Sequence, residues 1–174
     1  DDGVNWIEQI DIPDSFASVS KVLWFRIQSP TDLYIQYESQ EGHHNISYTS
    51  DSGQSWQTVY DGGIYDNTLR SFAVSNAAPN TMYVGTTTSI YKTTDHGQSW
   101  EQVGSFPVWS LSLHPTDPNI LFAGNYRTRD GGITWELIIN PNVWIGALST
   151  SESDPNVVYV SSYAYEDGIG RTID

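Results

Sequence analysis

The chain has 174 residues, with 21 acidic side chains against 7 lysines and arginines, and a formal net charge of −14. This balance argues against nucleic acid or an anionic membrane surface as the partner, because both select basic patches. The chain contains no cysteine, which excludes disulfides and thiolate chemistry, and no apolar run near the roughly 18 residues that span a bilayer.

Short apolar segments bounded by Gly, Pro, Asn and Asp follow one another along the chain, and none has helical periodicity. They repeat in an order of four strands, A to D. Strands A are expected at residues 23–28, 71–75, 108–113 and 143–148, and strands B at 33–35, 82–84, 121–123 and 158–160. Strands C are expected at 46–49, 90–93, 126–128 and 169–172, and strands D at 6–10, 56–60, 100–103 and 135–139. The sequence therefore predicts an all-β chain in four units of four short antiparallel strands.

An eight-residue motif leads into each internal strand D. Its pattern is Thr-x-Asp-x-Gly-x-Ser/Thr-Trp, and it occupies residues 49–56, 93–100 and 128–135. The Asp carboxylate can accept hydrogen bonds from its own turn, the Gly tolerates a positive φ, and the Trp can pack beneath the turn. We therefore expect a structural role for nine residues, which are Asp51, Gly53, Trp56, Asp95, Gly97, Trp100, Asp130, Gly132 and Trp135.

Both chain ends carry a part of the motif, so that the motif aspartates are Asp1, Asp51, Asp95, Asp130 and Asp174. A period near 40 residues, built from short strands, is typical of β-propeller blades. We interpret residues 1–174 as a single domain, either a closed four-bladed propeller or a segment of a larger one. In a closed ring, residues 6–10 would complete the last blade. In a segment, further propeller repeats or a second copy of the chain would pair with the open ends.

The motif resembles the Asp-box (BNR) repeat of the β-propellers found in sialidases, sortilin-type receptors, xyloglucanase-type glycosidases and photosystem II assembly factors. The resemblance extends over essentially the whole chain and implies blades of four antiparallel strands. It implies no single function, because the motif itself is a structural turn. The favoured function is a non-catalytic binding module or scaffold that recognises a glycan or a protein on its loop face. The alternative is part of a glycoside hydrolase resembling xyloglucanases or sialidases.

The D–A and B–C connections of such a propeller share one face, opposite the A–B turns and the motifs. Loops that depart from the repeat are where function concentrates. For a hydrolase, the acid and base are expected among the loop-face carboxylates Glu38, Asp61, Asp66 and Glu166. They would need a separation of about 5–5.5 Å or about 6.5–9.5 Å across one cleft, and one of them a raised pKa.

For a binding module, aromatic side chains on the same face should matter more than acids, because sugars stack their apolar faces on rings. The candidates are Tyr37, Tyr65, Trp109, Trp144, Tyr163 and Tyr165. Trp109 and Trp144 stand at equivalent starts of strand A, where the sequence favours core between blades over a stacking platform. No cofactor is implied. A metal is not expected either, because the adjacent His43 and His44 would point to opposite sides of a strand. We expect an extracellular or periplasmic location, with a glycan or protein partner and no membrane insertion.

Overall fold

The computed structural model describes residues 19–64, 68–162 and 169–173. The predictions for Tyr65, Asp66, Tyr163, Tyr165 and Glu166, for the strand at 6–10 and for the terminal motif pieces lie outside these residues. The chain divides into two compact units, Asp1–Asn67 and Thr68–Asp174. The described part of the chain contains strands and turns, and it includes no helix that is long and apolar enough to cross a membrane.

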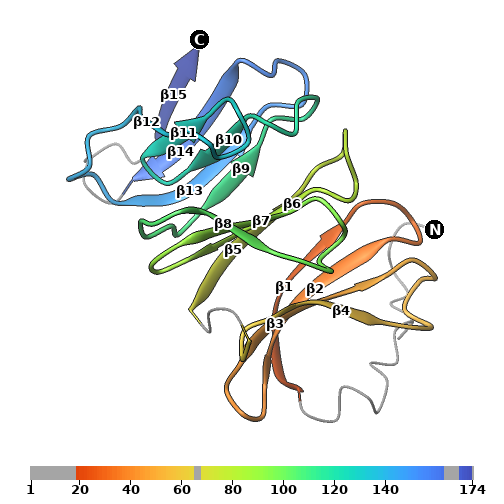
Figure 1. Ribbon diagram of the computed structural model, residues 1–174. Coiled ribbons are helices and arrows are strands. Elements are labelled where there is room, and N and C mark those ends of the chain that lie inside the picture. The colour runs from red at the N-terminus through yellow and green to blue at the C-terminus, as the bar shows by residue number, and fades with distance from the viewer. Residues whose placement is uncertain (1–18, 65–67, 163–168, 174) are drawn as a thin grey trace. The chain divides into compact units, whose positions relative to one another are not determined.

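The first unit contains one antiparallel sheet whose four strands follow each other in chain order (Figure 1). The strands are β1 (Val19–Ile27), β2 (Leu33–Ser39), β3 (His44–Thr49) and β4 (Gln57–Asp61). The inner strands β2 and β3 contain most of the buried residues, and the ring of Tyr34 on β2 is fully enclosed. This is the expected pattern for a strand with hydrogen-bonded neighbours on both sides.

The second unit contains three antiparallel sheets with the same order of strands (Figure 1). The second sheet consists of β5 (Leu69–Val74), β6 (Met82–Thr86), β7 (Ile90–Thr93) and β8 (Glu101–Gly104). The third consists of β9 (Leu111–Leu113), β10 (Leu121–Ala123), β11 (Tyr126–Thr128) and β12 (Glu136–Leu137). The fourth has three strands among the described residues, β13 (Ile145–Thr150), β14 (Val157–Ser162) and β15 (Ile169–Ile173).

Within the second unit, the first strands of successive sheets lie side by side and in the same direction. Leu148 N donates to Ser110 Oγ at 2.9 Å, and Thr150 N donates to Ser112 Oγ at 2.9 Å, so one constant offset relates β13 to β9. Small hydroxyl side chains permit this close approach of two backbones. Apolar side chains fill the space between the sheets, with one core around Val108 and Leu121 and another around Phe122 and Val158.

The A–B turn and the motif turn lie at the same end of each of the first three sheets. Backbone hydrogen bonds join the two turns: Ser52 N to Thr31 O, His96 N to Asn80 O, and Gly131 N to Asn119 O, all within 3.0 Å. We call this end of a sheet its motif end. The opposite end, which carries the B–C hairpins and the segments that enter strands A, is its loop end. This arrangement confirms the separation of faces that the repeat predicts.

Candidate functional site

The motif turns are self-contained hydrogen-bonded units. In the first copy, Asp51 Oδ1 accepts bonds from Thr49 Oγ1 at 2.7 Å and Ser55 N at 2.8 Å, while its Oδ2 accepts one from Ser55 Oγ at 2.6 Å. Gly53 N donates to Thr49 Oγ1 at 3.0 Å. The carboxylate therefore receives its bonds within its own turn, as the motif predicts.

The copies around Asp95 and Asp130 repeat these bonds at nearly the same distances. Hydrogen bonds lower the pKa of all three carboxyls to about 2, and the hydroxyl of the motif Ser or Thr is the largest cause each time. A carboxyl with so low a pKa remains ionised and is unsuited to act as a general acid near neutral pH.

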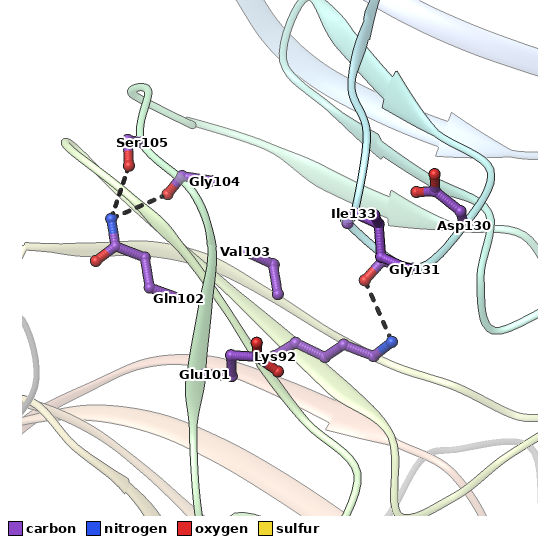
Figure 2. A pocket seen from close by; sticks show the side chains of 10 residues that line it. Lys92, Glu101, Gln102, Val103, Gly104, Ser105, Asp130, Gly131 and Ile133 are labelled. Atoms are coloured by element: carbon purple, nitrogen blue, oxygen red, sulfur yellow. Dashed lines mark hydrogen bonds between the residues drawn. The ribbon is translucent and has the colours of Figure 1, made fainter.

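The third motif turn also fastens its sheet to the second sheet. The indole Nε1 of Trp135 donates to Val103 O at 2.7 Å, and the Lys92 ammonium donates to Gly131 O at 3.2 Å. Gly132 has a φ of +99°, and a Cβ built there would lie 2.7 Å from the Cβ of Val103. Figure 2 shows the groove of about 860 Å³ that the turn forms with strand β8. Trp56, Trp100 and Trp135 are each partly buried.

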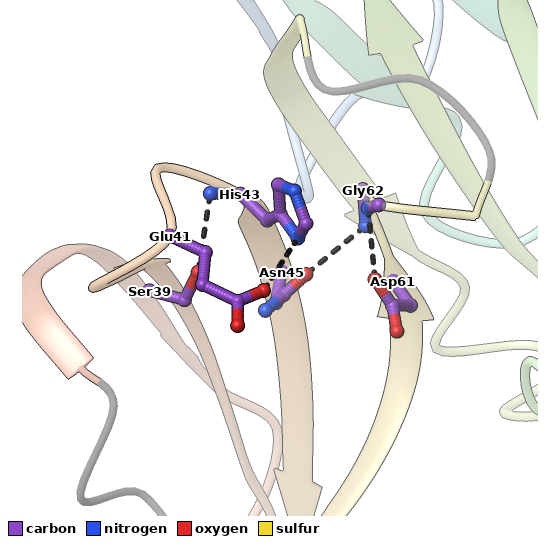
Figure 3. Close-up of polar contacts among 7 residues, drawn as sticks. Ser39, Glu41, His43, Asn45, Asp61 and Gly62 are labelled. Carbon is purple, nitrogen blue, oxygen red and sulfur yellow. Dashed lines mark hydrogen bonds and ion pairs between the residues drawn. The ribbon is translucent and has the colours of Figure 1, made fainter.

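At the loop end of the first unit, the acidic candidates Glu38 and Asp61 are held by local contacts, and Figure 3 shows those around Asp61. Glu38 forms an ion pair with Lys21 at 3.0 Å, and Asp61 Oδ1 accepts a bond from Gly63 N at 2.8 Å. Glu41 lies 3.8 Å from the His43 ring, and Asn45 Oδ1 accepts a bond from Gly62 N at 3.0 Å. These contacts fasten the two loops at this end, and they give both catalytic candidates a structural partner.

The two kinds of aromatic candidate differ in exposure. Tyr37 is only 6% exposed and belongs to the core of the first sheet with Ile35, so its ring does not offer a stacking surface. Trp109 and Trp144 are 45% and 66% exposed. The interpretation of these two tryptophans as core between blades is therefore wrong. A buried residue precedes each of them, Val108 or Val143, and takes the core position instead.

Trp109 and Trp144 form a pair at the loop end of the second unit. Their ring centroids are 6.4 Å apart and the ring planes meet at 42°. They flank a hollow of about 140 Å³, which is also lined by Pro107, Gly124, Asn125, Pro141, Val143 and Ile145. Because the rings come from neighbouring sheets of one unit, packing of the sheets sets the spacing between them.

Asn125 positions the segment that carries Trp144. Its Nδ2 donates to Asn140 O at 2.8 Å and to Val143 O at 3.0 Å, which ties the D–A connection to the B–C hairpin. On the other side of the pair, Val108 N donates to Thr86 O at 2.8 Å and anchors the residue before Trp109. Both tryptophan backbones are thus held from adjoining loops.

Arg70 extends the pair into a row across three sheets, and the sequence analysis did not find it. Its guanidinium carbon lies 4.9 Å from the centroid of the Trp109 ring, which is cation–π distance. Arg70 follows the buried Leu69 just as Trp109 follows Val108 and Trp144 follows Val143. This shared position after an aliphatic residue is the sequence feature from which Arg70 could have been predicted. We call Arg70, Trp109 and Trp144 the loop-end row.

Among the described residues, no group of three or more His, Asp or Glu side chains is arranged to hold a metal ion. The loop-end row offers two exposed aromatic rings, tilted by 42° to each other, and a cationic group as its means of recognition. It contains no pair of carboxylates.

No family model and no curated protein sequence matches the chain. Among solved structures it is similar to the Niastella koreensis GH74 enzyme, with a TM-score of 0.67, 18% identity and coverage of 88% of this chain and 28% of that one. An ancestral GH74 enzyme matches with a TM-score of 0.63, 18% identity and coverage of 89% and 23%. YCF48 bound to D1 peptide matches with a TM-score of 0.52, 14% identity and coverage of 88% and 68%.

These likenesses show the fold alone. The sheets of this chain are β-propeller blades. The chain spans about a quarter of the length of the two GH74 enzymes, 23% and 28%. The blades are all-β and antiparallel as predicted, and three strands of the fourth blade lie among the described residues.

Proposed function

We propose that the chain is a non-catalytic segment of an Asp-box β-propeller that binds a glycan at the loop-end row. The observation that carries this proposal is the exposure of Trp109 and Trp144 on either side of a hollow. Two large rings left in water on adjoining blades are unfavourable for the free protein and mark a binding surface. Sugar rings present an apolar face to an aromatic ring and hydroxyl groups to neighbouring amides.

The arrangement of the acids supports binding rather than hydrolysis. Glu38 and Asp61 each have a local partner, Lys21 and the backbone N–H of Gly63. The motif aspartates are ionised and held by their own turns. We expect the chain to lie outside the cell or in the periplasm, where it could meet polysaccharides.

The test is a binding titration of the full chain against a panel of soluble plant and microbial polysaccharides, in parallel with single variants. Trp144→Ala should weaken binding by at least about tenfold, because loss of one stacking ring removes on the order of 1.4 kcal/mol. Trp24→Ala is the matched control. Trp24 is 67% exposed on β1 and is not part of the loop-end row. Equal losses in the two variants would argue against a specific site, and no binding to any polysaccharide would overturn the glycan proposal.

A protein ligand is the second candidate. YCF48, whose fold is similar, was solved bound to D1 peptide. An exposed aromatic pair of this kind also suits a peptide with apolar side chains. A pull-down that loses its partner in Trp144→Ala, with no polysaccharide bound by the wild type, would favour this candidate.

A hydrolase segment remains the alternative because two similar structures are GH74 enzymes. It requires that polysaccharide cleavage by the chain be lost in Asp61→Asn or Glu38→Gln while binding is kept. Cleavage products from the wild type would establish the alternative, and unaltered polysaccharide after prolonged incubation would remove it for this segment.

A further inference from the structure

Charge is distributed unevenly over the second unit, although the chain as a whole is strongly acidic. All acidic side chains among its described residues lie in A–B turns, in motif turns or at the starts of strands D, at the motif end. They are Asp95, Glu101, Asp117, Asp130, Glu136, Glu152 and Asp154. At the loop end, Arg70 is the one charged side chain within the described residues of this unit.

The Arg70 guanidinium is available to a ligand. It is exposed, and no carboxylate of the described residues forms an ion pair with it. Its contact with the Trp109 ring holds the planar group beside the tryptophan pair. A stacked guanidinium keeps its N–H donors directed outward along the plane, where they can meet a planar anion.

From this arrangement we infer that the loop-end row selects an acidic glycan, whose sugar ring stacks on the tryptophans while its carboxylate meets Arg70. The inference rests on the proposed function and names the substrate class for the same site. A uronic acid carries its carboxylate on the sugar ring itself, so one residue supplies both the apolar face and the anion. A neutral glycan would leave the guanidinium without a new partner.

The described carboxylates of the second unit lie at its motif end, away from the loop-end row. At physiological ionic strength, charges more than about 8 Å apart in water are largely screened, so the carboxylates at the motif end contribute little at the opposite end. Among the described residues of this unit, Arg70 is the charge nearest to a uronate bound on the tryptophans and attracts it. Selection should therefore be strongest at low salt and should decline as the salt concentration rises.

The experiment compares uronic-acid oligosaccharides, such as oligogalacturonides, with their own carboxyl-reduced forms, which differ only in the loss of the charge. The wild-type chain should bind the acidic form about tenfold more tightly, the effect of roughly one charge-assisted hydrogen bond at an exposed site. Arg70→Gln should remove this preference and leave the affinity for the reduced form within about twofold. Trp144→Ala should weaken the binding of both forms.

Arg129→Gln is the matched control, because it makes the same change in net charge at an exposed position of the motif end. It should leave both affinities within about twofold of the wild type. Equal binding of the acidic and reduced forms by the wild type, or equal losses in Arg70→Gln and Arg129→Gln, would overturn the inference and leave the proposed function standing. If neither form binds to the wild type, while other polysaccharides do, the inference also fails. If no glycan binds at all, the proposed function fails with it.

Discussion

The two ends of the second unit use the same kinds of side chain for opposite purposes. At the motif end, Asp95 and Asp130 receive hydrogen bonds from their own turns, and the Trp135 indole donates to Val103 O. At the loop end, Trp109 and Trp144 remain exposed, and Arg70 lacks a described carboxylate partner. A side chain whose interactions are complete stabilises the fold. One whose interactions are incomplete is free to bind something else, so the difference predicts which substitutions affect stability and which affect binding.

The largest expected effect on stability is that of Trp135→Ala. The indole packs edge-on against Phe106 with centroids 5.1 Å apart, and its N–H joins two blades. Its removal should lower the free energy of unfolding by about 3 kcal/mol, near the lower limit for a large aromatic because the ring is only partly buried. Chemical denaturation followed by fluorescence measures the change.

Trp144→Ala is the comparison for Trp135→Ala at the opposite end. Because its ring is 66% exposed, it should lower the free energy of unfolding by less than about 1 kcal/mol while it weakens ligand binding. Equal losses of stability in the two variants would contradict the conclusion that the motif end stabilises the fold and the loop end binds a ligand.

The fold could be predicted from the sequence because its signals are local and repeated. The Thr-x-Asp-x-Gly-x-Ser/Thr-Trp pattern predicts most hydrogen bonds of each turn. The apolar runs between the turns predict where the strands lie. The largest departures in where a strand begins are at β1, which begins at Val19 instead of residue 23, and β9, which begins at Leu111 instead of residue 108. At β9 the backbone of Val108 bonds to Thr86 of the neighbouring blade, a contact with no local signal.

The candidate site was less predictable, because exposure is decided by tertiary packing. Tyr37 and Trp109 both stand near strand ends among turn residues, yet one is enclosed by its own sheet and the other faces solvent. Arg70 became a candidate only when its contact with a ring 39 positions along the chain was known. A single repeat does not reveal such a row, because each blade contributes only one of its members.

The second effect on stability is a dependence on pH at the motif end. Asp51, Asp95 and Asp130 have folded-state pKa values of about 2, lower than the ordinary value near 3.8. A lowered folded pKa means that the stabilisation is complete above the unfolded pKa and is lost as the pH falls through the folded pKa. Thermal unfolding temperatures should therefore be constant above about pH 5 and fall steeply between about pH 4 and pH 2.

Asp95→Asn sharpens this test, because the amide keeps the size of the side chain and cannot titrate. This variant should be less stable than the wild type near neutral pH, and its unfolding temperature should change less between pH 4 and pH 2. Glu152→Gln is the control. Glu152 is an exposed acid in the A–B turn of the fourth blade, so its profile should follow the wild type. Identical profiles for all three proteins would show that the motif carboxylates do not set the acid stability.

The smallest expected effect compares two serines of one motif turn. Ser52 adopts a φ of +60° at the position where the third turn has Gly131 with a φ of +74°. Ser52→Gly removes the strain of a left-handed non-glycine residue, about 1–2 kcal/mol, and adds about 0.5–1 kcal/mol of unfolded-state entropy. The net result should lie between no change and a gain of about 1.5 kcal/mol, measured by chemical denaturation. Ser55→Gly, in the same turn, removes the hydroxyl that donates to Asp51 Oδ2 at 2.6 Å and should instead destabilise the protein. A loss of stability in both variants would mean that the Ser52 side chain stabilises the turn by more than its positive φ costs.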